Sequence, residues 1–445
     1  MKDRFLWIGT AIYAALFAVL GAVKYGAHRN LVDFGIFSQT VASAFGCFCN
    51  PIEGSHWAFH FSPILYIAAL PLSLVRSPLI LIVLQALAGA LCAAPVYGMV
   101  RARTDRSIAR FAAIVVWLYP PLAGLTFGDF HENGFAPAAV AWTIYAFDAG
   151  YIGLAAAFAA IVLSIKEDQA IFLGVAALVG AIAYRADRKR RTLAICVAVA
   201  CGAVATAFFV FIQPHAAAAP GWQPDRFYAW TAQDARSLFG IGTGARLWFL
   251  VAIFAPLAFL PFRSRATWLA AAPLAEVLFS RMSTTYTLGT HYAGAWIGYV
   301  FAGFAMATGN SSIRVRRALW WAAGLAAVEL LVANPLHPGL NLRGRQGRDV
   351  ALDESLANLP RYASLATQEE AYTHLALGDP LARLLPERAD VVTHACFVLL
   401  DRDFPLSARL QEYAPSIDAL VRARIYVPIS RSGGIELYRR SAACR

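Results

Sequence analysis

The sequence has few charged residues. Only 15% of its 445 residues are Asp, Glu, Lys or Arg, whereas soluble domains carry about a quarter. Hydrophobic residues make up 59% of the chain, and the mean hydropathy is +0.55. This composition is typical of an integral membrane protein and does not fit an ordinary soluble domain.

The sequence also lacks the short motifs of common hydrolases and nucleotide-binding enzymes. It has no His-Glu-x-x-His zinc motif, no nucleophile-elbow serine and no Walker loop. It has no internal repeat, a feature that many transporters show. The net charge of +11 does not indicate nucleic acid, because most basic residues lie in short loops between apolar runs. We therefore expect no nucleotide cofactor and no nucleic-acid partner.

Long apolar runs recur through the first three quarters of the chain, and about 20 apolar residues are enough to cross a bilayer. No small-residue cleavage site follows the first run, so we expect it to remain as a span. Basic clusters fix the cytoplasmic side and give a cytoplasmic N-terminus; they lie at residues 2–4, 101–110, 185–191, 263–265 and 314–317. The predicted spans are approximately 5–24, 78–100, 111–127, 136–148, 151–165, 169–184, 192–213, 246–262, 266–281, 292–308 and 318–335.

One apolar segment, residues 61–75, does not fit as a crossing span. A crossing there would move the basic cluster at 101–110 to the outer side, against the positive-inside rule. We therefore expect a re-entrant or interfacial helix at 61–75, with an extra crossing elsewhere as the alternative.

The outer loops collect most of the unusual polar residues. The first outer loop, 25–60, contains two acids and three histidines, and the loop at 213–244 is rich in aromatic residues and arginine. The outer-loop residues of interest are Asp33, Glu53, His56, His60, Asp129, His131, Glu132, Lys166, Glu167, Asp168, Trp222, Arg226, Tyr228, Trp230, Arg236, His291 and Tyr292.

These residue types suit the binding of a phosphate or a divalent metal. Lys166 is a normal phosphate partner, and Glu167 or Asp168 would hold it in place. The histidines and carboxylates could line one outer cavity for either ligand, so a metal requirement stays open. The alternative for 166–168 is a solvated turn between two helices.

Asp33 has two interpretations. Phe34, Phe37 and Val41 recur at helical spacing, which predicts a short amphipathic helix in the plane of the membrane interface. Asp33 would then be the N-cap of this helix. Alternatively, Asp33 lies in a site that is shielded from water just outside the membrane span, and is a reactive group there.

From residue 336 the composition changes and predicts a small α/β domain. We expect strands at 362–367 and 395–400, helices at 369–377 and 407–422, and a hairpin of 425–429 with 435–439. Cys396 and Cys444 would bridge if this domain is extracytoplasmic. The predicted domains are thus a membrane domain, 1–335, and a soluble extracytoplasmic domain, 336–445.

Several short sequences resemble an uncharacterised bacterial family of polytopic membrane proteins, which is distantly similar to GT-C glycosyltransferases. They are DFGIFSQ at 33–39, HFSPILY at 60–66, PVY at 95–97, FHE at 130–132 and KED at 166–168. The resemblance spans roughly residues 1–310. It implies an all-α membrane bundle of about 11–13 helices with a GT-C-like arrangement and a small α/β domain at the C-terminus.

GT-C enzymes carry an acidic residue in the first outer loop and take a sugar from a polyprenyl-phosphate carrier. The resemblance therefore implies that Asp33 is the catalytic base of an inverting reaction. Many such enzymes have paired acids at this position, whereas Asp33 is followed by Phe34. We expect Lys166, His131, His291 and His60 to contact the donor phosphate, supported by Gln39, Glu132, Glu167, Asp168 and Tyr292.

The resulting hypothesis is a multi-pass glycosyltransferase of the bacterial inner membrane. It would transfer a sugar from the lipid carrier to a glycan, lipid or protein acceptor outside the cytoplasm. One alternative is a transporter or flippase of a lipid-linked or anionic solute, with Glu276 and Glu329 as polar groups within spans. Another is a non-catalytic envelope assembly factor that binds a partner through its C-terminal domain.

Overall fold

The chain forms two compact units in a computed structural model that describes residues 3–216, 242–309, 313–333, 335–360, 364–385, 395–404 and 410–442. The helical unit comprises Met1–Val19, Trp57–Ile67 and Ile82–His337. The sheet unit comprises Leu20–His56, Ala68–Leu81 and Pro338–Arg445. Helices α1 (Arg4–Gly26) and α3 (Ile64–Leu74) contribute residues to both units.

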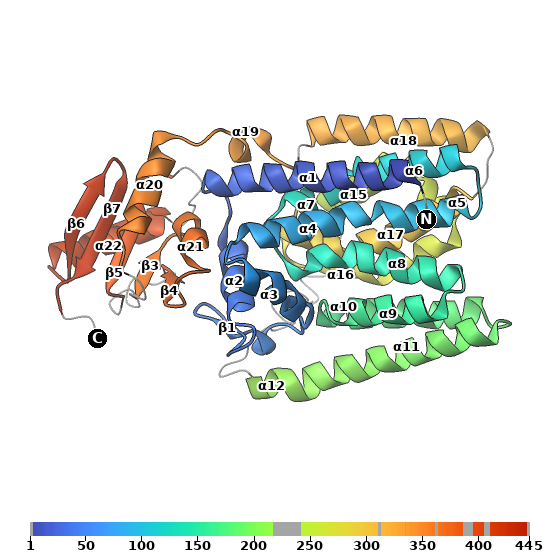
Figure 1. The fold of residues 1–445 in the computed structure, drawn as a ribbon, viewed down its shortest axis with the longest axis horizontal. Coiled ribbons are helices and arrows are strands. Elements are labelled where there is room, and N and C mark those ends of the chain that lie inside the picture. The colour runs from blue at the N-terminus through green and yellow to red at the C-terminus, as the bar shows by residue number, and fades with distance from the viewer. Residues whose placement is uncertain are drawn as a thin grey trace. The chain divides into compact units, whose positions relative to one another are not determined.

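The helical unit is built from helices of unequal length (Figure 1). They are α4 (Leu79–Leu91), α5 (Ala93–Arg101), α6 (Arg106–Trp117), α7 (Pro120–Phe127), α8 (Ala136–Asp148), α9 (Ile152–Leu163), α10 (Glu167–Ala183), α11 (Arg188–Thr206), α12 (Gln213–Ala216), α15 (Thr243–Phe254), α16 (Ala271–Phe279), α17 (Ile297–Ala307) and α18 (Ile313–Val332). Short 3-10 turns connect several of them, including η2 (Glu132–Phe135) and η8 (His291–Ala295).

Three helical stretches within the described residues are long and apolar enough to cross a membrane: Arg4–Gly26, Leu79–Arg101 and Arg188–Ala216. Helices α6 and α7 would form a fourth span if they act as a bent pair, with an angle of 49° between them. The bend coincides with two prolines at the start of α7, which cannot continue the hydrogen-bond ladder of α6. The predicted span 246–262 is α15 followed by 3-10 turns, so several predicted spans are interrupted helices.

Helix α17 is the buried centre of the helical unit. Every residue from Ile297 to Ala305 is buried, and Tyr299, Phe301 and Phe304 are among the largest fully buried side chains. The hydroxyl of Tyr119, just before α7, donates to the carbonyl of Ile253 in α15 at 2.7 Å. A helix that is apolar all round is buried on all sides, as this one is.

The segment 61–75 contains α3, a helix of 11 residues. At 1.5 Å per residue it is about 16 Å long, about half of a 30 Å hydrocarbon core. Its length fits the expectation of an interfacial or re-entrant helix, and the topology itself stays a prediction.

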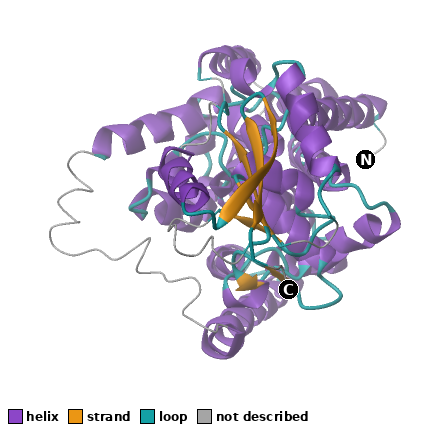
Figure 2. Ribbon diagram, turned by 90° about the vertical axis from the view of Figure 1, so that its left-hand side faces the viewer, coloured by secondary structure: helices purple, strands orange, loops and turns teal. Residues whose placement is uncertain are grey.

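The sheet unit contains a mixed five-stranded sheet in the order β4-β3-β5-β7-β6 (Figure 2, strands in orange). Strand β3 (Leu365–Thr367) is parallel to β4 (Ala382–Leu384) and to β5 (Phe397–Asp401). Strand β7 (Ile435–Arg440) is antiparallel to β5 and to the edge strand β6 (Tyr426–Ser432), which carries an irregularity between Pro428 and Ser430.

Two hydrophobic clusters cover opposite faces of this sheet. Val398 and Leu400 of β5 pack with Ile417 of α22 (Leu410–Arg422). Leu399 points to the other face and belongs with Leu352 of α20 (Gly347–Ala357). This alternation follows from the two-residue period of a strand, and it explains why β5 reads as a continuous apolar run.

The prediction of a mostly helical chain with a small C-terminal mixed sheet is confirmed. The predicted strand at 395–400, the helix at 407–422 and the hairpin correspond to β5, α22 and β6–β7, and the helix at 369–377 is α21 (Glu369–Leu375). Strand β4 and helix α20 were not predicted. The Cys396–Cys444 pairing lies outside the described residues, because Cys444 is not among them.

Helix α2 (Val32–Ala42) corrects two expectations about the first outer loop. Its N-cap is Leu31 and makes no side-chain cap, so Asp33 lies in the first turn and is not the N-cap. The helix is also not amphipathic in its burial, because Ser38 and Gln39 are buried along with the phenylalanines. An acid in the first turn still interacts favourably with the helix dipole.

Ser38 and Gln39 of α2 are buried with their hydrogen bonds satisfied: the Ser38 hydroxyl donates to the carbonyl of Phe34 within the helix, and Gln39 finds partners in the C-terminal part of the sheet unit. The amide of Gln39 donates to the carbonyls of Asp379 and Ala382, each at 3.1 Å. The hydroxyl of Tyr372 in α21 donates to the side-chain oxygen of Gln39. Gly35 permits this approach, because a Cβ there would lie 2.3 Å from the Tyr372 ring. Helix α2 of the first outer loop and the C-terminal domain therefore pack together as one structure.

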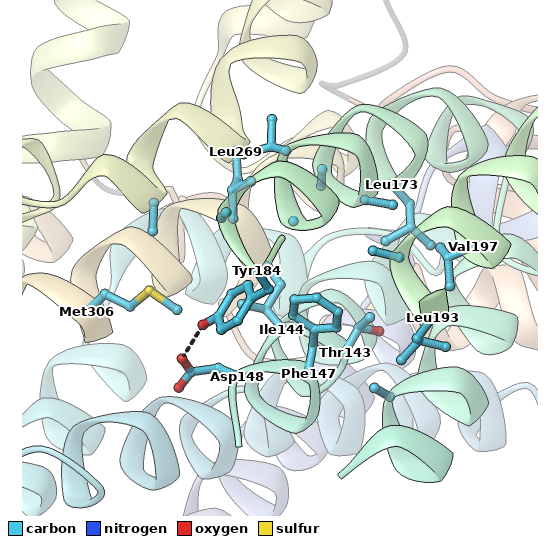
Figure 3. Close-up of a pocket in the computed structure, with 18 of the residues that line it drawn as sticks. Thr143, Ile144, Phe147, Asp148, Leu173, Tyr184, Leu193, Val197, Leu269 and Met306 are labelled. Atoms are coloured by element: carbon cyan, nitrogen blue, oxygen red, sulfur yellow. Dashed lines mark hydrogen bonds between the residues drawn. The ribbon is translucent and has the colours of Figure 1, made fainter. Parts of the chain in front are cut away.

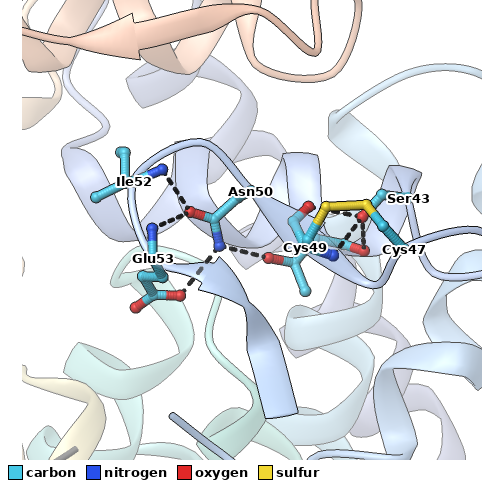
Figure 4. Close-up of a disulfide and its surroundings, with 7 residues drawn as sticks. Ser43, Cys47, Cys49, Asn50, Ile52 and Glu53 are labelled. Atoms are coloured by element: carbon cyan, nitrogen blue, oxygen red, sulfur yellow. Dashed lines mark hydrogen bonds between the residues drawn. A yellow bond between two sulfur atoms is a disulfide. The ribbon is translucent and has the colours of Figure 1, made fainter. Parts of the chain in front are cut away.

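A disulfide between Cys47 and Cys49 closes a tight turn after α2 (Figure 4). The Ser43 hydroxyl bridges to the same turn: it donates to the carbonyl of Cys49 at 2.7 Å and accepts its N–H at 2.9 Å. The amide of Asn50 donates to the carboxylate of Glu53 at 3.0 Å. The sequence did not predict this disulfide.

Candidate functional site

The loop that carries His131 is held by one buried side chain, Gln85 of α4. The amide nitrogen of Gln85 lies within 3.1–3.3 Å of the carbonyls of Leu125, Thr126, Gly128 and Asp129. Its side-chain oxygen accepts the N–H of His131 at 3.1 Å. Gln85 thus holds the end of α7 and the loop that follows it as far as His131. Sequence reasoning missed this residue, although a lone amide within a long apolar run was a usable signal.

Glu167 connects the start of α10 to the segment before α3. One carboxylate oxygen lies 2.9 Å from Nδ1 of His60, and the other accepts the N–H of Phe61 at 2.9 Å. The Glu167 side chain is only 3% exposed. A buried carboxylate is stable only when it is paired and hydrogen-bonded, and Glu167 meets both conditions.

Lys166 and Asp168 form a second ion pair beside Glu167. Nζ of Lys166 lies 3.5 Å from Oδ2 of Asp168, with the two side chains 10% and 12% exposed. These residues precede the predicted span 169–184. The predicted alternative of a solvated turn is therefore wrong, because the turn is buried.

His131 stacks on His291, with ring centroids 3.9 Å apart and an angle of 9° between the rings. The ring of His291 also contacts Tyr292, at 4.1 Å between centroids. Nδ1 of His131 accepts the N–H of Asn133 at 3.4 Å.

Glu132 is the least satisfied acid of the group. Oε2 of Glu132 lies 2.9 Å from Nδ1 of His131, but neither carboxylate oxygen has a hydrogen-bond partner among the described residues. The side chain is fully buried. We use the name polar cluster for His60, His131, Glu132, Lys166, Glu167, Asp168, His291 and Tyr292.

The charges of the polar cluster are mutually dependent. Burial opposes protonation of His60, but the Glu167 carboxylate outweighs it and raises the pKa of His60. Burial also opposes the charge on Lys166, and nearby carboxylates, Asp168 first, outweigh it and raise the Lys166 pKa. Burial raises the pKa of Asp168 to about 6 despite the neighbouring Lys166. The cluster therefore holds its two cations firmly charged and can take up a proton near pH 6.

Glu132 interacts electrostatically with both His60 and Lys166, which connects the contacts of His131 with those of Glu167 and Asp168. The eight residues of the polar cluster all lie within the helical unit. Asp33 and Gln39 belong to the sheet unit, where Asp33 is half-buried in the first turn of α2. Most of the aromatic loop 213–244 lies outside the described residues, including Trp222, Arg226, Tyr228, Trp230 and Arg236.

A separate apolar pocket lies at the other end of α10 (Figure 3). Its volume is about 270 Å³, and Leu173, Val197 and Leu269 are among the residues that line it. The Tyr184 hydroxyl donates to Asp148 at 3.0 Å on its border. The residues of α10 that line the pocket begin at Leu173, about two turns after Glu167, and no residue of the polar cluster lines it. The pocket is therefore not part of the polar cluster.

One group of possible metal ligands is found in the described part of the sheet unit. His28, Asp353 and His374 each offer a ligand atom, and these atoms lie within 4.8 Å of one another. Sequence reasoning missed this group, because His28 lies more than 300 residues before Asp353 and His374 in the chain.

The profile of a family described as predicted membrane proteins, DUF2079, matches residues 29–377. The chain belongs to the DUF2079 family. The match includes helix α2, the polar cluster and helix α21, so it covers the contacts described above in both units. No match was found among curated proteins.

The fold of this DUF2079 protein is similar to that of ArnT from Cupriavidus metallidurans. The structure of ArnT bound to undecaprenyl phosphate matches with a TM-score of 0.63 at 12% identity, over 99% of each chain. Its apo structure matches with a TM-score of 0.57 at 13% identity, over 97% of each chain. The apo Archaeoglobus fulgidus oligosaccharyltransferase gives a TM-score of 0.45 at 12% identity, over 90% of this chain and 70% of that one, which is too low to support an argument. The fold therefore resembles that of GT-C glycosyltransferases, as the sequence motifs implied.

Proposed function

We propose that this DUF2079 protein is a glycosyltransferase that takes a sugar from a polyprenyl-phosphate carrier. The observation that carries the proposal is the fold similarity over the whole chain to ArnT, whose structure was determined with undecaprenyl phosphate bound. A second support is the polar cluster, since buried ionisable groups near helix ends are costly and are typical of functional sites.

In the proposed reaction, Asp33 accepts the proton of the attacking acceptor hydroxyl. The reaction is inverting, so the acceptor attacks the sugar directly and the lipid phosphate leaves. Negative charge grows on that phosphate as the glycosidic bond breaks, and cations or hydrogen-bond donors that meet it lower the barrier. Lys166, His60, His131 and His291 are the residues proposed for this role.

The acids of the polar cluster have a supporting role in this proposal. Asp168 pairs with Lys166, and Glu167 pairs with His60, so both cations are held in fixed positions. A preformed arrangement of this kind avoids reorganisation during the reaction. Gln39 supports Asp33 by anchoring α2 to α21 and β4. Tyr292 supports the ring of His291.

We propose that the active face is extracytoplasmic, in a bacterial inner membrane. The Cys47–Cys49 disulfide supports this orientation for the first loop, because disulfides persist in oxidising compartments and are rare in the cytosol. The acceptor is then a glycan, lipid or protein outside the cytoplasm.

The test incubates the purified protein in liposomes with a panel of polyprenyl-phosphate sugars together with glycan, lipid and protein acceptors. Mass spectrometry then measures both the free polyprenyl phosphate that is released and the sugar that is joined to an acceptor. We expect Asp33→Asn and Lys166→Met each to lower the rate at least 100-fold, in the range of one lost acid–base or electrostatic contact. The matched controls are Glu354→Gln and Lys189→Met, which alter exposed residues and should keep full activity.

Two results would contradict the proposal. If an Asp33→Asn variant that inserts normally released polyprenyl phosphate at the wild-type rate, Asp33 would not be the catalytic base. Movement of the intact lipid-linked sugar across the bilayer, with no release of polyprenyl phosphate from any donor, would instead support a flippase.

A further inference from the structure

His28, Asp353 and His374 come from three segments of the sheet unit. His28 follows α1 and is fully buried, Asp353 lies on α20, and His374 lies on α21. Nε2 of His28 lies 2.9 Å from Oδ1 of Asp353. The rings of His28 and His374 are stacked, with centroids 3.8 Å apart and an angle of 22° between them.

A backbone hydrogen bond determines which ring nitrogen of His374 can bind a ligand. Nε2 of His374 lies 2.9 Å from the carbonyl of Tyr25 and must donate to it. The lone pair of His374 is therefore on Nδ1. A histidine that donates its other ring N–H to a backbone carbonyl is the usual arrangement of a metal ligand.

The nitrogen of His28 that faces Asp353 is Nε2, so Nε2 is the atom that would bind the ion. The second carboxylate oxygen of Asp353 is held by Arg345. This contact orients the carboxylate and leaves its other oxygen directed at His28, as the outer partners of metal-ligating carboxylates do.

We propose that His28, Asp353 and His374 bind one divalent transition-metal ion, with zinc as the best fit. Two imidazole nitrogens and one carboxylate oxygen are ligands that zinc accepts in tetrahedral geometry. Ligand atoms around zinc lie about 3.4 Å apart, from bonds of about 2.1 Å. Because the three atoms already lie within 4.8 Å of one another, side-chain rotations are enough to close the site.

Three protein ligands leave a fourth position for water. The Asp353 side chain is 37% exposed, which gives an ion a path into the group. The ion would join the segment after α1 to helices α20 and α21. That segment leads directly into α2, so the metal would hold α2 on the C-terminal domain. This proposal does not depend on the glycosyltransferase activity.

The test uses the purified full-length protein in detergent, stripped with a chelator, loaded with Zn²⁺ and desalted. Bound zinc is then counted by mass spectrometry. We expect about one zinc per chain in the wild type and at least a tenfold loss in His374→Ala and in Asp353→Asn. Asp353→Asn keeps the side-chain shape, so it tests the ligand even if His374→Ala fails to fold. The matched control is His215→Ala, an exposed histidine, which should keep its zinc.

A second measurement separates this site from the polar cluster. Zinc should raise the thermal unfolding temperature of the wild type and of His131→Ala, and should leave that of Asp353→Asn unchanged. Two results would overturn the proposal: no zinc retained by the wild type, or zinc that stays in Asp353→Asn and is lost in His131→Ala.

Discussion

Replacing Gln39 by leucine tests whether the C-terminal domain holds the helix that carries Asp33. Gln39 makes two hydrogen bonds to the backbone carbonyls of Asp379 and Ala382 and accepts one from the Tyr372 hydroxyl. Leucine has a similar volume and no polar atoms. The substitution therefore removes three hydrogen bonds from a buried position with little change in packing.

The free-energy cost of this substitution comes from the hydrogen-bonding groups of Asp379, Ala382 and Tyr372 that lose their partner. Each lost hydrogen bond costs about 1 kcal/mol net, and a buried hydroxyl without an acceptor costs about 1–3 kcal/mol. Tyr372 is fully buried, so its hydroxyl cannot turn to water. Two lost bonds and one unpaired hydroxyl should make local opening of α2 easier by about 3–5 kcal/mol, a factor of about 150 to 5,000 in the opening equilibrium.

Hydrogen–deuterium exchange of the α2 amides measures this equilibrium directly. Tyr372→Phe should give a smaller increase, about 1 kcal/mol, because it removes one hydrogen bond and leaves Gln39 its two carbonyls. Asn358→Leu, at the exposed residue that follows the end of α20, is the control and should leave α2 unchanged. Exchange in Gln39→Leu within twofold of the wild type would refute the reasoning.

Three further outcomes are expected. Burial raises the pKa of Asp168 from 3.8 to about 6, so between these two pH values the folded state binds a proton that the unfolded state has already lost. The free energy of unfolding should therefore fall as pH rises from about 4 to about 6. The unfolding temperature of Asp168→Asn should lack this dependence on pH. Gly294→Ala places a Cβ 2.2 Å from the carbonyl oxygen of Asn133 and should lower the unfolding temperature through overpacking of about 1–3 kcal/mol, whereas Gly324→Ala meets no atom within 4 Å and should not. Cys196 lies on the surface of the apolar helix α11, whereas Cys92 and Cys201 are buried; in detergent, a small membrane-permeant maleimide should therefore modify Cys196 faster than either, and equal rates would contradict the described burial.

Much of the fold could be predicted because its signals are local. The hairpin β6–β7 follows from two apolar runs around Gly433 and Gly434, and helix α22 follows from its periodicity. The polar cluster was also anticipated in part, because the positive-inside rule placed the loops of His131, Lys166 and His291 on one face. The contacts His60–Glu167 and His131–His291 agree with that grouping.

The rest depends on contacts between distant segments. The burial of Gln39 on α2 could not be predicted from its polarity, because its hydrogen-bond partners lie more than 300 residues away in the chain. The group of His28 and His374 likewise exists only once α21 packs beside the end of α1. Strand β4 has three residues, too few for any period to show. Local patterns cannot encode such pairings.

The edge strand β6 has a consequence for how these proteins associate. Pro428 has no N–H to offer a neighbouring strand, and the irregularity after it breaks the regular spacing of the backbone groups. Arg431 adds a charge on the exposed half of the strand. A strand from another molecule could not form a continuous row of backbone hydrogen bonds with β6, so this edge disfavours association of two copies in a crowded membrane.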